Sequence, residues 1–242
     1  MLQKISDRVY ILPPSQETDR PSLGLVCGDK FSLAIDSGIS PNHAREFLTE
    51  YGKLNCSPLH YLILTHHHYD HVFGISEMNL LTLAHEKIEE ELRLMRSYHW
   101  DDVSLASLVE KGIIPQFGAE CIKTENKDRE NLGIGSVDMT FSASVTIDLG
   151  GIICEVKEIE NSHVDGSVII YILEEKVLFL GDCIYGSRHN GVYGYSKEKY
   201  DKLKTAVSAY DADYFIISHE EIQDKKGMAA IWEGIEKEAT FF

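Results

Sequence analysis

The chain has 242 residues, of which 43% are hydrophobic and 26% are charged, and its formal net charge at pH 7 is -16. This length and composition predict one large α/β domain with an ordinary hydrophobic core, rather than two domains or a disordered chain. The acidic balance, with no stretch rich in Lys or Arg, argues against a nucleic-acid partner because such a surface repels a phosphate backbone.

No apolar run approaches the roughly 20 residues that cross a bilayer, and the opening "MLQKISDRVYILPP" lacks the apolar core of a signal peptide. We therefore expect a cytoplasmic protein with a small-molecule substrate and no membrane partner; the sequence leaves its oligomeric state open. The five cysteines form no CxxC pair, so they predict neither a disulfide framework nor a cysteine zinc site. Most of them are expected to be small buried hydrophobes.

Short apolar runs broken by Gly, Pro and Asp begin the chain, a pattern typical of strands joined by tight turns. They are "RVYILP", "SLGLVCGD" and "FSLAIDSG". A helix is expected over "HAREFLTEYG", followed by buried strands over "LHYLILT" and "LLTLAH". Apolar residues at helical spacing then predict a helix from Glu86 onward and another from Asp102 to Lys111.

The second half of the chain repeats this order of strands before helices. After an expected loop over "TENKDRENLGIGS", strands are predicted over "DMTFSASVTIDLG" and "IICEVKEI", then a hairpin over "SVIIYILEEKVLFLGD". A helix with Tyr200, Leu203 and Val207 on its apolar face, the strand "DYFIIS" and a last helix follow. Two sheets with helices outside them are the natural architecture. We assign residues 1–242 to one domain with a helical and loop insertion at about residues 98–135.

The segment "THHHYDH" places four potential metal ligands directly after a buried strand. In an extended segment alternate residues point the same way, so His66, His68 and Asp70 are expected to converge. A turn immediately afterwards can bring His71 beside them. These four exceed what one tetrahedral ion needs if further ligands approach, so the motif predicts two metal ions.

Three later residues also follow strands and carry ligand-type side chains. His163 lies in "SHVDGS" between two strands, Asp182 ends "VLFLGD", and His219 ends "YFIISH". Each of them alone is a weak signal. Together they supply what a dinuclear site at one edge of the sheets would need.

The segments "THHHYDH", "SHVDGS", "LFLGDC" and "IISHEE", in this order, resemble the metallo-β-lactamase fold superfamily, and the resemblance covers nearly the whole chain. It implies an αββα sandwich of two mixed β-sheets flanked by helices, with the metal ions in a cleft at the sheet edges. By position it implies the following ligands: His66, His68 and His163 for the first metal, Asp70, His71 and His219 for the second, and Asp182 between the two. Asp36 in "AIDSG" matches a strand-end aspartate that orients a ligand histidine. An ordinary turn aspartate is the alternative.

A site of imidazoles and carboxylates favours two divalent zinc ions, and the absence of a thiolate leaves iron or manganese open. We therefore predict a dinuclear-metal-dependent hydrolase that acts on a small ester, thioester or lactone through a metal-bridging hydroxide. The expected catalytic residues are Asp70, which orients the hydroxide, and the bridging Asp182. A small-molecule phosphodiesterase and an iron-dependent oxidoreductase similar to persulfide dioxygenases are the alternatives.

Departures from the superfamily's branches narrow the expectation. Hydrolysis of β-lactams as the main task is disfavoured, since Cys183 lies one residue beyond the position where many β-lactamases carry a cysteine ligand. The C-terminal helical extension of glyoxalase II and the basic motifs of the nucleases have no counterpart. Lactonases of N-acyl-homoserine lactones share the ligands and the length, whereas a metal-holding scaffold without catalysis is the least favoured reading.

The loop "CIYGSRHNGVYGYS" after Asp182 offers side chains for a substrate pocket, because the lactonases hold their substrate with a tyrosine near the metals. The candidates are Tyr185, Arg188, His189, Tyr193 and Tyr195. Packing of these aromatic residues on a glycine-rich loop is the alternative. The segment from about Tyr98 to Gly118 is expected to form the other wall.

Overall fold

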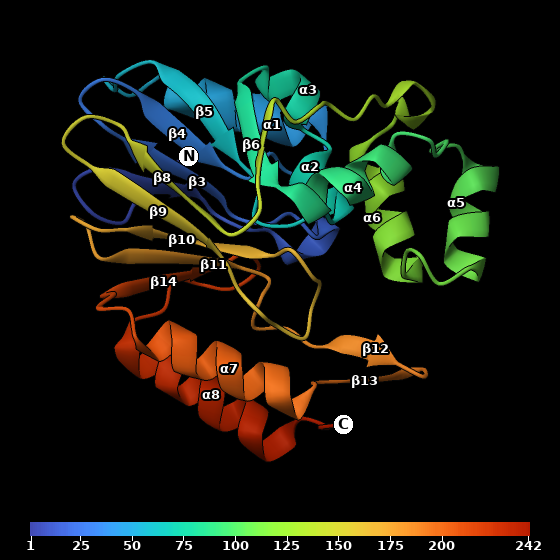
Figure 1. Ribbon diagram of the computed structural model, residues 1–242. Coiled ribbons are helices and arrows are strands. Elements are labelled where there is room, and N and C mark those ends of the chain that lie inside the picture. The colour runs from blue at the N-terminus through green and yellow to red at the C-terminus, as the bar shows by residue number, and fades with distance from the viewer.

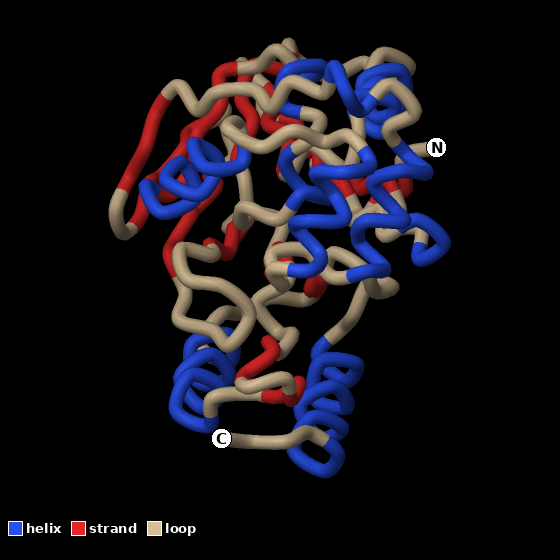
Figure 2. The backbone as a smooth tube through the Cα atoms, turned by 90° about the vertical axis from the view of Figure 1, so that its right-hand side faces the viewer, coloured by secondary structure: helices blue, strands red, loops and turns tan.

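Two β-sheets face each other between two layers of helices in a computed structural model that describes residues 1–242 (Figure 1). Seen after a 90° turn, the helices form groups on both sides of the strands (Figure 2). The αββα sandwich of two mixed sheets expected from the sequence is therefore confirmed. None of the helices combines the length and the apolar character that crossing a membrane requires.

The first sheet contains seven strands that lie side by side in chain order. They are β1 (Gln3–Lys4), β2 (Val9–Leu12), β3 (Leu23–Cys27), β4 (Ser32–Ile35), β5 (Leu59–Ile63), β6 (Leu81–His85) and β7 (Met139–Phe141). The pairs from β1 to β4 are antiparallel, and those from β4 to β7 are parallel. Parallel neighbours need long connections, and these connections carry helices.

Those helices cover the outer face of the first sheet and one end of the sandwich. They are α1 (Pro41–Tyr51), α2 (Tyr69–Val72), α3 (Ile75–Met78), α4 (Glu86–Met95), α5 (Asp102–Glu110) and α6 (Gln116–Glu125), with 3₁₀ turns η1 (Gln16–Thr18) and η2 (Arg129–Asn131). Helix α1 begins as its sequence dictates: the Ser40 hydroxyl accepts a hydrogen bond from the His43 N–H, and Pro41 occupies the first turn.

The second sheet has five strands in the order β14-β11-β10-β9-β8. The strands are β8 (Ser144–Asp148), β9 (Ile153–Glu158), β10 (Val168–Ile172), β11 (Val177–Gly181) and β14 (Tyr214–Ile217). Helices α7 (Lys197–Ser208) and α8 (Lys225–Glu238) cover its outer face (Figure 1). The strand expected over residues 138–150 is in fact two strands, because the turn between β7 and β8 carries the chain from one sheet to the other.

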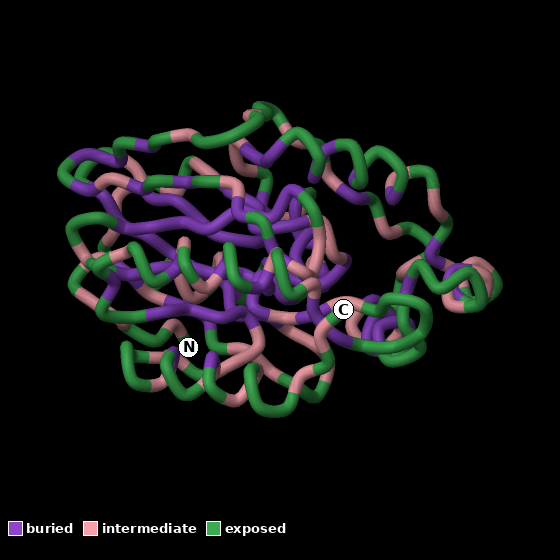
Figure 3. The backbone as a smooth tube through the Cα atoms, turned by 60° about the horizontal axis from the view of Figure 1, so that its bottom comes forward, coloured by how far each residue is buried: buried purple, intermediate pink, exposed green.

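Successive side chains of the central strands point to opposite faces of the sheet, and both faces are covered, which explains why these strands are continuous apolar runs in the sequence. In β10, Val168, Ile170 and Ile172 pack between the two sheets. Ile169 and Tyr171 point outward against α7 and α8. Both faces are buried, so every position is apolar. Buried residues accordingly concentrate in the strands at the centre of the molecule (Figure 3).

Several short elements were not predicted from the sequence, of which α6 and a hairpin matter most for the site. Helix α6 lies mostly in residues 112–123, which were left without an assigned element between the expected helix and the expected loop, and with α5 it extends away from the sheets as an arm (Figure 1). The loop after Asp182 contains a short antiparallel hairpin, β12 (Ser187–His189) and β13 (Val192–Gly194), on the same side as this arm. Both are short, partly exposed elements whose residues lack a clear apolar period, so the pattern did not reveal them.

Two of the five cysteines lie in contact with each other. The Sγ atoms of Cys27 in β3 and Cys56, which precedes β5, lie 2.6 Å apart. The other three, Cys121, Cys154 and Cys183, are buried as expected. The parallel pairing of β4 with β5 brings the two cysteines together. Their spacing in the sequence therefore did not reveal this contact.

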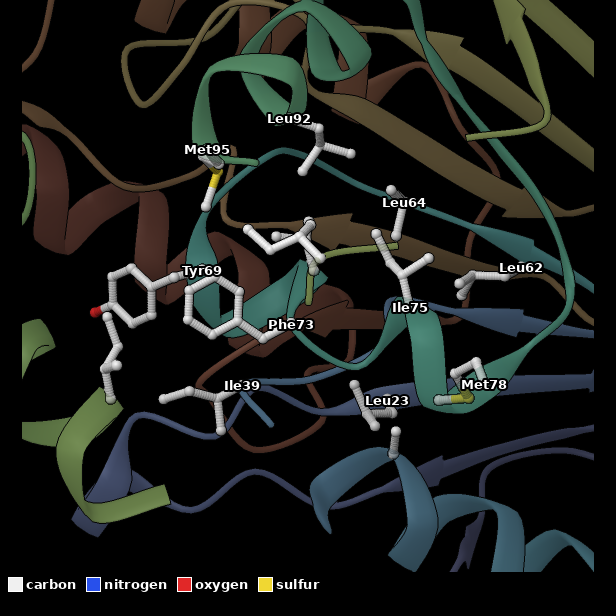
Figure 4. Packing of buried hydrophobic residues seen from close by; sticks show 14 of the residues in the cluster. Leu23, Ile39, Leu62, Leu64, Tyr69, Phe73, Ile75, Met78, Leu92 and Met95 are labelled. Carbon is white, nitrogen blue, oxygen red and sulfur yellow. The ribbon is translucent and has the colours of Figure 1, made fainter. Parts of the chain in front are cut away.

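Phe73 anchors the segment that carries the ligand motif to the core under the first sheet. It is fully buried, and its ring centroid lies 4.7 Å from that of Trp100. Figure 4 shows its ring beside Tyr69, among Ile39, Ile75 and other apolar side chains.

We expect Phe73→Ala to lower the free energy of unfolding by about 3–5 kcal/mol, because the vacated volume cannot be filled by neighbours held in regular elements. Urea denaturation measures the change. Leu94→Ala, on the exposed face of α4, is the control and should stay within about 0.5 kcal/mol of the parent. A loss below about 1 kcal/mol for Phe73→Ala would contradict the packing described here.

Candidate metal centre

The motif "THHHYDH" is extended only as far as His68, which is the N-cap of α2. Asp70 therefore lies with His71 on a short helix and does not continue the extended alternation of His66 and His68 that the sequence analysis expected. His66 and His68 enter one group of potential ligands, and Asp70 and His71 enter a second. The helix begins here because Tyr69, Val72 and Phe73 bury their side chains against the core.

The first group contains His66, His68, His163 and Asp182, whose ligand atoms all lie within 4.8 Å of one another. His163 Nε2 lies 3.0 Å from His68 Nδ1 and 3.6 Å from Asp182 Oδ2. His66 Nε2 lies 3.7 Å from the same carboxylate oxygen. His68 thus presents Nδ1 to the group, whereas His66 and His163 present Nε2.

The second group contains Asp70, His71, His219 and again Asp182. Asp70 Oδ2 lies 3.0 Å from His71 Nε2 and 3.2 Å from His219 Nε2. Asp182 Oδ1 lies 3.7 Å from His71 Nε2, and its Oδ2 lies 3.5 Å from His219 Nε2. The structure therefore brings together all seven residues expected from the sequence, and Asp182 is common to both groups.

These separations fit metal coordination. Ligand atoms about 2.0–2.1 Å from one zinc ion at tetrahedral angles lie roughly 3.3 Å apart, close to the distances within each group. His66 Nε2 and Asp182 Oδ1 are buried and have no hydrogen-bond partner. Buried polar atoms are almost always paired, so these two orphaned atoms indicate that a cation is their natural partner.

Comparison with known proteins agrees with this geometry. The sequence model of the metallo-beta-lactamase superfamily matches residues 19–219. The chain belongs to this superfamily. No curated protein sequence matches the chain.

Several solved structures share the fold at low sequence identity. A metallo-beta-lactamase from Pontibacter korlensis has a TM-score of 0.66 at 16% identity, over 98% of this chain and 99% of that chain. DIM-1 metallo-beta-lactamase has a TM-score of 0.65 at 16% identity, over 98% and 97%. A double mutant of the sec-alkyl sulfatase PisA1 has a TM-score of 0.69 at 14% identity, over 98% of this chain and 41% of that chain. These likenesses establish the fold.

A buried carboxylate at the end of β4 holds the candidate metal site in place. Asp36 Oδ2 lies 2.8 Å from His71 Nδ1 and accepts a 2.7 Å hydrogen bond from the Thr65 hydroxyl. Its Oδ1 accepts a 2.7 Å bond from the Thr65 N–H. Asp36 thus contacts a ligand histidine as the resemblance implied, which fixes the ring with Nε2 facing the second group.

Burial sets the protonation of the first group. It lowers the pKa of His66 well below its ordinary value, with repulsion from His71 as the next cause. Burial also lowers the pKa of His68 to about 3. Both imidazoles are therefore neutral at pH 7, which is the form that binds a metal ion.

The second group behaves differently because two carboxylates face its histidines. Burial alone would lower the pKa of both histidines, but Asp70, followed by Asp36 and Asp182, raises the pKa of His71 well above its ordinary value. Asp182 and Asp70 raise the pKa of His219 to about 10. In turn, burial would raise the pKa of Asp70 and Asp182, but the two histidines hold both well below the usual range. Without cations, protons on the imidazoles neutralise the carboxylates.

The two groups lie at the base of a cavity of about 390 Å³. One wall comes from Ile113 and Pro115, between α5 and α6, and the other from Tyr185 and Tyr193. Both segments proposed from the sequence as walls therefore contribute. The Tyr193 hydroxyl accepts a 2.9 Å hydrogen bond from the Gly186 N–H, which holds the hairpin against the cavity.

Three of the five candidate pocket residues do not line the cavity, and this corrects the sequence analysis. Arg188 and His189 are exposed on β12, where Arg188 donates to the Gly191 carbonyl and His189 packs against Phe242. Tyr195 is buried in the core under α7 and α8.

Asp19 lines the cavity beside the second group and was missed by the sequence analysis. Its Oδ2 accepts a 2.7 Å hydrogen bond from the Tyr69 hydroxyl, and its Oδ1 lies 3.9 Å from His219 Nδ1. Burial, and then repulsion from Asp70, raises the pKa of Asp19 above its ordinary value. No local motif marks this residue, so only the fold could reveal its position.

We expect the purified protein to bind close to two divalent ions per chain. Asp182→Ala should lower occupancy below about one ion, because this side chain faces both groups, whereas His219→Ala should leave about one. Elemental analysis after zinc loading and gel filtration measures both. His189→Ala removes an exposed histidine outside the groups and should keep the parent stoichiometry. A loaded parent that never exceeds one ion would contradict the dinuclear site.

Zinc loading at pH 7.5 should release protons. His71 and His219 hold theirs at this pH in the metal-free protein, because their pKa values are raised, and each must lose it to become a ligand. Calorimetry in buffers of different ionisation enthalpy should find about two protons released, and about one from His219→Ala. Loading without proton release would show that the carboxylates do not raise these pKa values.

Proposed function

We propose that this chain is a dinuclear metal-dependent hydrolase of a small carboxylic ester, thioester or lactone. The observation that carries the proposal is the convergence of seven ligand-type side chains into two groups that share Asp182, at the base of an open cavity. The small cavity favours a small-molecule substrate. Zinc is the favoured metal, because imidazole nitrogens dominate the donor set, and iron and manganese are the alternatives.

When bound, two divalent cations supply a hydroxide nucleophile at neutral pH and polarise the oxygen of the bond to be cleaved. The chain's own residues prepare the site for this chemistry. Neutral His66 and His68 present their unprotonated nitrogens, and Asp36 holds His71 in one orientation. Asp70 faces both histidines of the second group, which places its carboxylate to orient the attacking water.

The lining of the cavity favours a carbonyl substrate over a phosphodiester. No lysine or arginine is among its lining residues, and the net charge of the chain is -16. A phosphoryl group would therefore depend on the cations alone for charge neutralisation, whereas a neutral carbonyl requires no basic side chain. We expect the protein to act in the cytoplasm, in accord with the sequence analysis.

We expect metal-dependent turnover of a thioester or a lactone to exceed that of bis-p-nitrophenyl phosphate. Release of thiol, acid or nitrophenol measures the three reactions, with Asp70→Ala and His68→Ala as blanks. Cleavage of the phosphodiester alone above these blanks would overturn the carbonyl assignment. Consumption of dioxygen with a persulfide, in the absence of any hydrolysis, would favour the iron-dependent oxidoreductase instead.

A further inference from the structure

The charge of the cavity wall is unusual for a site that holds cations. The Asp19 carboxylate faces the cavity with its side chain 25% exposed, and the Tyr69 hydroxyl holds it there. Asp19 has a positive φ of 57°, a conformation that a short polar side chain tolerates and most others do not. The carboxylate is therefore fixed beside the second group rather than free to turn to solvent.

A second carboxylate, that of Glu220, does not line the cavity but is bound by a residue that does. The Tyr185 hydroxyl, which lines the cavity next to His163, donates a 3.2 Å hydrogen bond to Glu220 Oε1. Of these two carboxylates only that of Asp19 lines the cavity, whose base already contains Asp70 and Asp182.

No basic side chain offsets these charges. Arg20 follows Asp19 in the chain, but it points away into ion pairs with Glu125 at 2.8 Å and with Glu46 at 2.9 Å. Two divalent cations would bring four positive charges, of which Asp70 and Asp182 neutralise two. Asp19 on the cavity wall offsets a third, so the attraction that remains for an anionic group is weakened.

The walls of the cavity also contain apolar side chains. Ile113 and Tyr193 stand on opposite sides of the cavity and are each 50% exposed, with Pro115 beside Ile113. When a ligand covers apolar side chains that are exposed to water at a cavity mouth, their removal from water favours binding. An uncharged apolar group can fill this space, whereas a carboxylate there would be desolvated without a partner.

We propose, on the basis of the hydrolase function above, that the cavity selects substrates with an uncharged or cationic acyl chain against anionic ones, and that Asp19 is the main residue that sets this selection. Asp19 acts through charge on the part of the substrate that extends from the reacting carbonyl. It selects by repulsion, which needs no contact with the cleaved bond.

Three p-nitrophenyl esters with the same leaving group test the proposal: the butyrate is neutral, the hemisuccinate is anionic, and the 4-(trimethylammonio)butyrate is cationic. With the zinc-loaded parent, kcat/KM should be at least about tenfold lower for the anionic ester than for the other two. The Kd values of the corresponding non-hydrolysed amides, measured by calorimetry, should follow the same order.

Asp19→Asn removes the charge but keeps the shape, the acceptor for the Tyr69 hydroxyl and the tolerance of positive φ. It should reduce the discrimination against the anionic ester and amide about tenfold. Glu17→Gln, an exposed residue of the same 3₁₀ turn, makes the same change in net charge and should leave the discrimination unchanged. Zinc content and melting temperature establish that both variants are folded and loaded.

Salt provides a second measurement on the unmodified protein. Raising ionic strength should narrow the difference between neutral and anionic ligands, because screening weakens repulsion at a partly exposed site. The proposal would be overturned if the parent had equal kcat/KM and Kd values for the neutral, anionic and cationic ligands. It would also be overturned if the ratio of neutral to anionic values were unchanged in zinc-loaded Asp19→Asn. If the parent cleaves none of the esters, the hydrolase function fails, while the amide Kd values still decide the charge selection.

Discussion

The carboxylate of Asp36 is the contact on which the rest of the site depends. It is 1% exposed, and its two oxygens bind the Thr65 N–H, the Thr65 hydroxyl and His71 Nδ1. These bonds join the end of β4 to the end of β5 and to the helix that carries half of the second group. The Thr65 carbonyl in turn accepts a 2.9 Å bond from the Val168 N–H, which extends the connection to the second sheet.

Around this contact the protein buries several ionisable side chains, which are uncommon in protein cores. Asp70, His71 and Asp182 are almost completely inaccessible to solvent. Removing charged groups from water is costly unless they are well paired, and two carboxylates in one site repel each other. The three apolar layers supply the stability that offsets this cost. Bound cations would relieve the repulsion between these carboxylates, so metal occupancy of the site and stability of the fold are coupled.

The sheets bring the site together because several strands end at one edge. β5 leads into the histidine motif, β11 ends one residue before Asp182, and β14 ends two residues before His219. Gly181 has a φ of +54°, and a side chain there would collide with Thr65. This glycine therefore allows the end of β11 to approach β5 closely enough for Asp182 to face both groups of ligands.

The sequence by itself determined the long central strands, most of the helices and the identity of the seven ligand-type residues, because apolar periodicity and strand-end motifs are local signals. Only the tertiary structure decided which nitrogen of His68 faces the site, that Asp70 lies on a helix, and that Tyr195 packs in the core while Tyr185 lines the cavity. Asp19 is the clearest case: it meets Tyr69 across 50 residues of chain. Such a contact depends on how the sheets and turns pack, and no spacing within a short segment can encode it.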